Sequence, residues 1–284
     1  MLKDIDLFCG HPAHDIMKVS ELNCYVDEYF DIIKNNNIDI KYLCGEVNAS
    51  RSINIFDYVK QGYMKKNIVF TVNVDLAGKG RRSSTRKDPY KYGIDSWKQW
   101  CSKNDAELFI MEDCLLDHNE MGLCWQRWYI FDILEQNEIE YDQILIVDAD
   151  TIVHPDCPNF FNMTDRKLTS VHNDGSYDWV IRSLENYSYY LFDGFMSKWW
   201  NYIDCGFVIV NESHKSFLKK FIDMYWENKD TIKHVETFHT GTDQTPFNLL
   251  IEKENIDLKL LPYEFNMVDM HRKELLQEHL PFTD

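Results

Sequence analysis

The stretch ILIVDADTIVHP, Ile144 to Pro155, decides the fold, because two aspartates stand one residue apart directly after an apolar run. Four aliphatic residues in a row predict a buried strand, and the polar residues after them predict its carboxyl end. In open α/β sheets, ligands bind beyond the carboxyl ends of the strands. Asp148 and Asp150 are therefore candidate ligand-binding residues.

The spacing of these two aspartates favours a metal site. Side chains alternate across a strand, so residues i and i+2 can point the same way. Two carboxylates directed at one point repel each other unless a cation lies between them. A hard divalent ion such as Mn²⁺ or Mg²⁺ prefers oxygen ligands and bridges readily to a diphosphate. The alternative is that one aspartate caps the next turn and the other is solvated.

Strand-like and helix-like segments alternate on both sides of this stretch. Apolar or alternating runs predict strands at 67–74, 106–113, 142–150, 202–211 and 256–262. Helical spacing predicts helices at 93–105, 124–137, 213–228 and 242–254. We expect Asp95 or Ser96 to cap the first helix and Ser213 to cap the third. The alternation predicts an α/β fold with a mostly parallel central sheet flanked by helices.

Two segments depart from this regular pattern. Residues 1–66 are rich in Asp, Asn and Tyr and predict an N-terminal appendage packed on a main domain of residues 67–284. Residues 172–200 have little periodicity and predict a long loop, which in a compact domain usually serves binding.

The composition limits the classes of protein to consider. The chain has 284 residues, 44% of them hydrophobic, and a net charge of −17, which argues against a nucleic-acid-binding protein. Its eight cysteines form no CxxC pair and predict reduced thiols. Cys9, His11 and His14 could ligate a metal, but without a second cluster an ordinary turn is expected. With no 18-residue apolar run and no signal-peptide pattern, we expect a cytoplasmic protein without a membrane span. The sequence does not predict an oligomeric state.

Three segments in order resemble metal-dependent glycosyltransferases of the GT-A fold. They are ILIVDADTIVHPD (144–156), NYIDCGFVIVNES (201–213) and GTDQTPFNLLIEKENIDLKLLPYEFN (241–266). The resemblance is strongest to the retaining group that includes glycogenin and the bacterial lipopolysaccharide galactosyltransferases, and it covers roughly residues 67–271. Asp204 and Cys205 stand where that group usually has Asn and a small residue.

The resemblance implies a function and a set of site residues. A sugar would move from a UDP- or GDP-sugar to a glycan or other hydroxyl acceptor, with retention of configuration. The metal, Mn²⁺ or Mg²⁺, would be held by Asp148, Asp150 and His271, although the Gly and Lys-Pro-Trp context usual around that histidine is missing. The donor would contact Thr71, Asn73, Asp75, Arg127 and Asp148. The residues facing the sugar would be Asp204, Asp243 and Gln244.

Two further segments have candidate roles. The basic stretch GKGRRSSTRK (78–87) could fold over the diphosphate or grip an acidic acceptor. Its basic residues are Lys79, Arg81, Arg82, Arg86 and Lys87. The aromatic residues between 174 and 204 predict the acceptor site, because aromatic faces stack on sugar rings. The alternative for them is a hydrophobic subcore.

Three other functions remain open at this stage. VNVDLAGKGRRSS (72–84) is similar to the phosphate loop of sugar nucleotidyltransferases. VDADTIV (147–153) also fits the nucleophile loop of haloacid-dehalogenase-like phosphatases, although that loop normally opens its domain. A non-catalytic glycan-binding protein on a degenerate transferase fold is the third.

Overall fold

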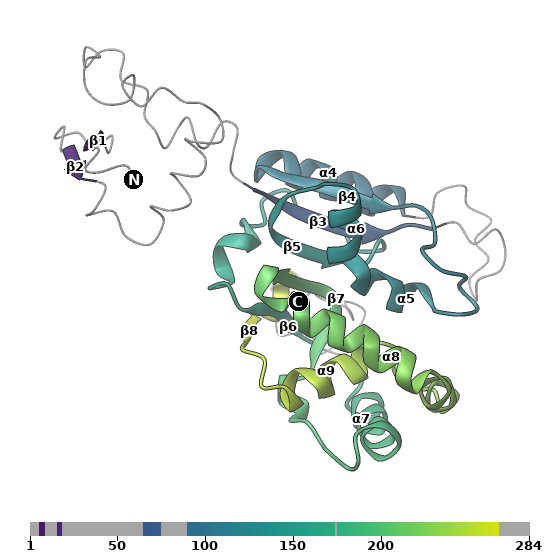
Figure 1. Cartoon of the computed structure of the whole chain (residues 1–284). Helices are drawn as coiled ribbons and strands as arrows, with labels where there is room; N and C mark the ends of the chain where they lie inside the picture. Colours follow the sequence, from purple (N-terminus) through teal and green to yellow (C-terminus); the bar gives the residue numbers. More distant parts are fainter. Residues whose placement is uncertain (1–5, 9–15, 19–64, 75–89, 174, 267–284) are drawn as a thin grey trace, which may run out of the picture. The chain divides into compact units, whose positions relative to one another are not determined.

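The chain consists of two compact units, Met1–Lys65 and Lys66–Asp284. The computed structural model in Figure 1 describes residues 6–8, 16–18, 65–74, 90–173 and 175–266. In the first unit, strand β1 (Asp6–Phe8) pairs antiparallel with β2 (Ile16–Lys18). All other described elements belong to the second unit. The predicted packing of the N-terminal residues on the main domain stays a prediction.

A sheet with the strand order β4-β3-β5-β7-β6-β8 forms the described centre of the second unit. Its strands are β3 (Lys66–Val72), β4 (Ala106–Met111), β5 (Tyr141–Val147), β6 (Leu168–His172), β7 (Ile203–Asn211) and β8 (Leu258–Leu261). Strand β7 is antiparallel to both of its neighbours, and every other pairing is parallel. The predicted mixed α/β class with a mostly parallel sheet flanked by helices is confirmed.

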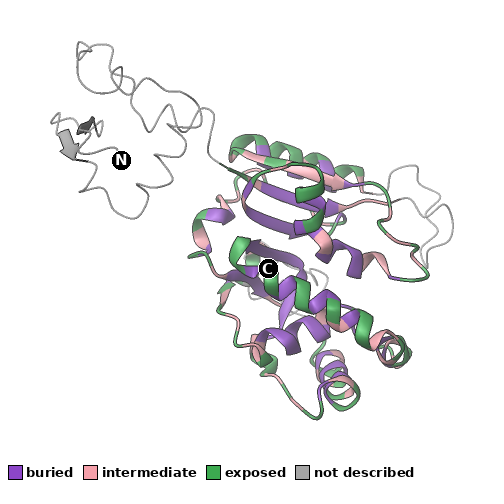
Figure 2. Cartoon of the chain, in the orientation of Figure 1, coloured by how far each residue is buried: buried purple, intermediate pink, exposed green. Residues whose placement is uncertain are grey.

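Helices cover both faces of this sheet (Figure 1). They are α4 (Lys91–Lys103), α5 (Leu123–Gln126), α6 (Ile130–Gln136), α7 (Tyr177–Leu191), α8 (Lys215–Glu236) and α9 (Gln244–Lys253). The helix predicted at 124–137 consists of α5, the 3₁₀ turn η3 (Arg127–Tyr129) and α6 in direct succession. Figure 2 shows buried strands between helices that expose only their outer sides.

The sheet separates two hydrophobic clusters, because successive side chains of a strand point to opposite faces. In β5, Ile144 and Ile146 join the cluster under helices α5 to α9, whereas Leu145 joins the cluster under α4. On the α4 side, the Trp100 ring stacks on Phe160 with a centroid distance of 5.0 Å. The four apolar residues of the opening stretch are thus buried on both faces, as a continuous apolar strand requires.

Helix α4 begins earlier than predicted. Its first residue is Lys91, and neither Asp95 nor Ser96 caps it. The Ser96 hydroxyl instead donates to the carbonyl of Gly93 at 2.7 Å and accepts the backbone N–H of Val153 at 3.1 Å. A serine that resembles a cap in the sequence therefore ties the helix to the loop after β5.

Helix α8 also begins differently from the prediction. Asn211 is the capping residue of the short 3₁₀ turn that leads into it, and its side chain accepts the backbone N–H of Ser213 at 3.0 Å. His214 completes the box by accepting the Asn211 N–H at 3.1 Å through Nδ1. The helix then runs from Lys215 to Glu236, with a kink at Asn228 (φ −124°, ψ 18°), the residue at which the prediction ended it.

The prediction of a long loop at 172–200 is wrong for half of that segment. Helix α7 occupies Tyr177–Leu191 and buries Val180, Leu184 and Tyr187 along one side. These positions follow the i, i+4, i+7 pattern of an amphipathic helix. Tyrosines on its exposed side and the two buried serines, Ser183 and Ser188, obscured that pattern in the sequence.

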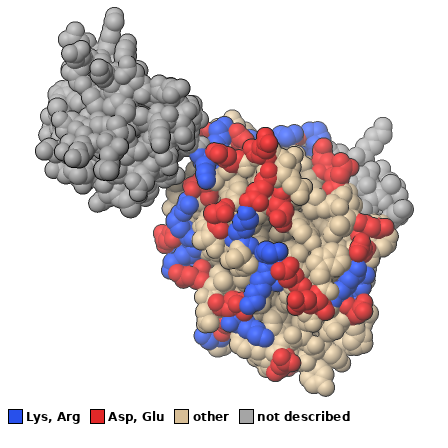
Figure 3. Space-filling view, viewed as in Figure 1, with Lys and Arg blue, Asp and Glu red and all other residues tan. Residues whose placement is uncertain are grey.

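The charged residues of the second unit are mixed in sign. On the face seen in Figure 3, acidic and basic side chains are interspersed, and pairs such as Lys220 with Glu254 at 2.6 Å link neighbouring helices. Exposed pairs of this kind contribute about 0.2–1 kcal/mol each. Within the described residues, no helix has both the length and the apolar character needed to cross a bilayer.

Candidate active site

The reversed direction of β7 brings two distant aspartates together. Because β7 is antiparallel to β5, it begins where β5 ends, with Phe207 opposite Val147. The backbone N–H of Asp148 donates to the carbonyl of Gly206 at 3.1 Å. Asp204, two residues before that glycine, therefore lies beside the DxD segment.

Gly206 marks where the two carboxylates converge. A Cβ atom built on Gly206 would lie 2.8 Å from Asp148 Oδ2 and 2.9 Å from Asp204 Oδ1. The space that a side chain would occupy is thus filled by two carboxylate oxygens. Any residue larger than glycine would push them apart, which explains the glycine at this position.

Strand β7 is irregular at the same place. Ser170 of β6 pairs with Val208 of β7. His172 comes two residues after Ser170, yet its partner, Ile203, comes five residues before Val208. Cys205 accordingly faces the α5–α9 side of the sheet and Phe207 the opposite side, although regular alternation would put them together. Bulges of this kind redirect side chains and are frequent beside active sites.

The turn that contains Asp150 is supported from α4. The backbone N–H of Thr151 donates to the carbonyl of Asp148 at 3.1 Å, and Trp97 Nε1 donates to the Thr151 hydroxyl at 2.9 Å. Gly93 of α4 lies so close that a Cβ there would come within 2.6 Å of the carbonyl oxygens of Ala149 and Thr151. Helix α4 therefore packs against the backbone of the DxD turn, whereas the Asp150 side chain is exposed.

Arg127 lies buried between two aspartates, with 8% of its side chain exposed. Its NH1 group donates to Asp148 Oδ1 at 2.5 Å. Its Nε and NH2 groups donate to Asp243 Oδ2 at 3.1 and 2.7 Å. A planar guanidinium suits this double contact, which a lysine could not make.

Asp243 and Gln244 have different surroundings. Asp243 is 2% exposed, and its Oδ2 also accepts the Trp128 indole N–H at 2.8 Å, while its Oδ1 accepts the Thr242 hydroxyl at 3.0 Å. Both oxygens of Asp243 are therefore engaged by protein groups. Gln244 is half-buried, and its Oε1 accepts the Cys205 N–H at 3.1 Å, next to Asp204.

Asp204 is also held from both sides. Its Oδ1 accepts the backbone N–H of Gly206 at 2.6 Å, and its Oδ2 accepts the amide of Asn173 at 3.0 Å. Burial raises the pKa of Asp204 to about 6, the Gly206 hydrogen bond opposes this, and the charge of Asp148 adds to it.

The charges of the neighbouring groups affect one another. Desolvation raises the pKa of Asp148 above its usual value, although half of this side chain is exposed. Arg127 opposes that rise, and the charges of Asp150 and Asp243 add to it. Burial lowers the pKa of Arg127, but the two aspartates outweigh burial and hold that pKa well above the ordinary value. The site combines a permanent cation with more negative charge than this one cation balances.

The predicted nucleoside contacts are at the end of β3, next to β5. Thr71 pairs with Val147, and among the described residues its buried hydroxyl has no hydrogen-bond partner. Asn73 is half-buried, and its backbone N–H donates to the carbonyl oxygen of Met111 at 2.9 Å. A buried hydroxyl without a partner at this edge is consistent with a ligand contact.

Several predicted residues lie outside the described part of the chain. They are Cys9, His11, His14, Asp75, the basic residues of 78–87, and His271. Among the residues that are described, no three His, Cys, Asp or Glu side chains are grouped so as to hold a metal ion. The described part thus contains the two aspartates of the predicted metal set and not its third member.

Some residues that shape this site belong to no motif with recognisable chemistry. Gly93, Trp97, Trp128, Asn173 and Gly206 contact or space the predicted groups without being chemically reactive themselves. Gly206 lies inside a quoted motif and could have been noticed as a glycine within an apolar strand. The contacts of Gly93, Trp97 and Asn173 depend on tertiary packing and had no local signal.

Comparison with known proteins gives distant likenesses among solved structures. No family model matches the chain, and no curated protein matches it. Among solved structures, the crystal structure of a glycosyltransferase involved in the glycosylation of the major capsid of PBCV-1 is similar, with 14% sequence identity and a TM-score of 0.38. The match covers 56% of this chain and 67% of that chain. A likeness this distant carries no conclusion about the reaction, which is argued below from the geometry of the site.

Proposed function

We propose that this protein is a metal-dependent glycosyltransferase that moves a sugar from a nucleotide-diphosphate donor to a glycan or other hydroxyl acceptor. The strongest support is the convergence of Asp148 and Asp204 over Gly206, beside the buried cation Arg127. This arrangement lies at the carboxyl end of β5 in a mostly parallel sheet, where ligands bind in such folds. The retaining outcome is proposed from the sequence resemblance alone.

The chemistry of the available donor atoms fits a hard divalent ion. Asp148 and Asp150 would supply oxygen ligands, and oxygen ligands suit Mn²⁺ or Mg²⁺. Arg127 contacts Oδ1 of Asp148, whereas Oδ2 of Asp148 lies toward Gly206. His271 is the further ligand that the resemblance implies. When bound, the ion would supply positive charge to the departing diphosphate.

The chain's own residues would orient the donor around that ion. Arg127 fixes the Asp148 carboxylate, and Asp243, with both oxygens engaged, fixes Arg127. Asp243 therefore suits a positioning role more than direct contact with the sugar. Asp204 and Gln244 would face the donor sugar. Thr71 and Asn73 would contact the nucleoside, for which the unpartnered Thr71 hydroxyl is the supporting observation.

An Asp150→Asn variant tests the metal role. We expect metal-dependent hydrolysis of the accepted UDP- or GDP-sugar to fall at least about 100-fold, because one charged ligand of the ion is lost. Its melting temperature should stay near that of the wild type, because the Asp150 side chain is exposed. Asp156→Asn is the matched control, since Asp156 is an exposed carboxylate on the same loop. The measurement is the rate at which each variant hydrolyses the nucleotide sugars of a panel, with Mn²⁺ and with EDTA.

The other outcomes point to different functions. Full activity in EDTA would contradict the metal role. Pyrophosphate release from a nucleoside triphosphate and a sugar phosphate would indicate a sugar nucleotidyltransferase. Release of phosphate from p-nitrophenyl phosphate, lost in Asp148→Asn, would indicate a phosphatase. Binding of glycans without any donor turnover would indicate a non-catalytic glycan-binding protein.

A further inference from the structure

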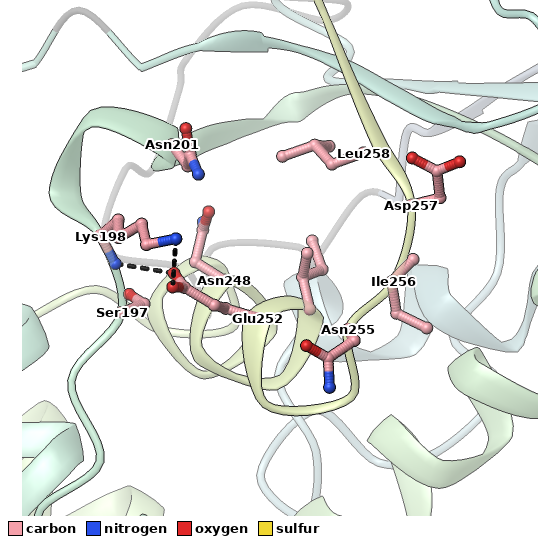
Figure 4. A pocket seen from close by; sticks show the side chains of 10 residues that line it. Ser197, Lys198, Asn201, Asn248, Glu252, Asn255, Ile256, Asp257 and Leu258 are labelled. Atoms are coloured by element: carbon pink, nitrogen blue, oxygen red, sulfur yellow. Dashed lines mark hydrogen bonds and ion pairs between the residues drawn. The ribbon is translucent and has the colours of Figure 1, made fainter.

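A cavity of about 330 Å³ lies between the segment before β7 and the end of α9 (Figure 4). Ser197, Lys198 and Asn201 line it from the segment before β7, and Asn255 and Asp257 line it from the chain after α9. Its volume lies at the lower end of the range for small-molecule sites, which is about 300–1,000 Å³. The cavity is therefore large enough for a small polar ligand.

The charges around this cavity balance one another. Lys198 Nζ lies 3.8 Å from Glu252 Oε1, and Asp257 is paired with Lys167 at 3.1 Å. Figure 4 shows the Lys198 and Glu252 side chains facing each other at one side of the cavity. Because each of these charged side chains has an opposite partner, the lining offers no surplus cation for a phosphate. A neutral ligand fits this lining better than a nucleotide does.

The lining also contains amide groups with open hydrogen-bonding capacity. Within the described part of the chain, the side chains of Asn201 and Asn255 have no hydrogen-bond partner, and both line the cavity. Each amide offers two N–H donors and one carbonyl acceptor. Sugar hydroxyls both donate and accept, so they match such groups better than an apolar or purely anionic ligand would.

Two exposed tryptophans stand between the lining residues in the chain. Trp199 and Trp200, which follow Lys198 and precede Asn201, are 42% and 55% exposed. Tyr177 packs edge-on against Trp199 with a centroid distance of 5.2 Å, and Trp199 packs edge-on against Trp200. Both indole side chains nevertheless remain substantially exposed. Exposed aromatic faces beside open amides are the combination expected of a sugar-binding surface.

The cavity is linked directly to the candidate active site. Asn248, which also lines the cavity, donates to the Ile203 carbonyl at 3.0 Å and accepts the Ile203 N–H at 2.7 Å. Ile203 is adjacent to Asp204. Asn201 lies three residues before Asp204, a separation of about 10 Å in extended chain. Asn248 thus joins the wall of the cavity to the strand that carries Asp204.

We propose that this cavity, with the neighbouring Trp199 and Trp200, is a binding subsite for a neutral saccharide unit of the acceptor. Its role in transfer rests on the proposed function, whereas saccharide binding at the cavity does not. The subsite holds a sugar away from the one that reacts and so favours an oligosaccharide acceptor over a single sugar.

The experiment uses the full chain and a double variant, Asn201→Ala with Asn255→Gly. Asn255 has a φ of 52°, which glycine adopts without strain, so the end of α9 should stay intact. Asn162→Ala is the matched control, because Asn162 is exposed and lies away from the cavity lining. Binding of maltotriose, cellotriose and mannotriose, with inorganic phosphate as the anionic probe, is measured by ligand-observed NMR.

We expect at least one of these trisaccharides to bind the wild type and the control alike, and to bind the double variant at least tenfold more weakly. Phosphate should not compete with it. With an accepted donor and a trisaccharide acceptor, the double variant should raise the KM for the acceptor and leave donor hydrolysis unchanged.

The two ways of failing can be told apart. If none of the trisaccharides binds, or if the double variant binds as the wild type does, the subsite is wrong even where donor turnover is intact. Competition by phosphate would also overturn it, because the occupant would then be an anion. If no donor is turned over but binding still depends on Asn201 and Asn255, the subsite stands and the proposed transferase function fails.

Discussion

At the scale of single residues, Arg127 is a buried charge whose stability depends on its two aspartate partners. It is buried, and it is the cation that Asp148 and Asp243 both contact. Burying an ion pair costs desolvation, which good geometry only partly offsets. Removing one partner of the pair destabilises the fold much more, because the remaining charge stays buried without a counter-ion. The arginine is thus a structural requirement of the site as well as a candidate donor contact.

An Arg127→Ala variant should lower the free energy of unfolding by about 3–5 kcal/mol, the range seen when one partner of a buried pair is removed. Urea denaturation at neutral pH measures this loss. Arg182→Ala is the control, because Arg182 is 44% exposed and its pair with Asp178 should contribute at most about 1 kcal/mol. An Arg127→Ala protein as stable as the control variant would contradict the proposed role of this buried network.

The charged residues of this network were expected from the sequence more often than its supporting residues. Asp148 and Asp150 came from their spacing after a strand, and Arg127, Asp204, Asp243 and Gln244 from the family resemblance, and their roles stay predictions. The structure brings Asp148, Arg127 and Asp243 into direct contact and sets Asp204 across Gly206 from Asp148. A motif indicates charged or polar residues at a set spacing. It does not indicate which glycine leaves space for those residues or which tryptophan contacts them, because those contacts come from elements far away in the chain.

At the scale of elements, the entry into α8 contains a buried titratable group. His214 is 7% exposed and accepts the Asn211 N–H, which closes a capping box. Burial lowers the pKa of His214 below the usual 6.5, and the charge of Arg166 adds to this. As pH falls below about 6.5, the unfolded chain takes up a proton before the folded one does. This histidine therefore reduces stability in mild acid.

A His214→Gln variant should lose that part of the acid sensitivity. Glutamine can accept the same N–H in a capping box, and it does not titrate. We expect the two proteins to have similar urea midpoints near pH 7.5, and the variant to lose less stability than the wild type between about pH 6.5 and 5. Equal slopes of stability against pH in that window would contradict the assignment, and an unequal midpoint at pH 7.5 would reveal a damaged cap.

The elements themselves were predicted with uneven success, for identifiable reasons. Strands with continuous apolar runs, such as β5 and β7, were located because their burial on both faces leaves a strong signal. Helix α7 was missed because its buried positions are few and its outer side carries tyrosines, which are poor indicators of a helix. The reversed direction of β7 was not predicted at all, since strand direction depends on connections and not on local composition.

At the scale of the whole molecule, the six-stranded sheet and the described helices lie within the second compact unit. Both hydrophobic clusters consist of residues between Ile68 and Phe265, and the strands from β3 to β8 belong to one sheet. A unit of this length can bury about 70% of the surface that its unfolded chain exposes, which suffices for a stable core. The candidate active site and the proposed saccharide cavity also lie within it.

A shortened chain that begins at Lys65 should therefore fold by itself. We expect a single cooperative urea transition, because one continuous sheet forms a wall of both clusters, so neither cluster can unfold while the other stays intact. Metal-dependent donor turnover should remain, since the residues proposed to orient the donor all follow Lys66. Circular dichroism and fluorescence followed together through the transition measure the folding. Transitions that do not coincide, or a chain that exposes its core and aggregates, would mean that residues 1–64 supply part of the core, and the N-terminal unit would then belong to the same cooperative fold.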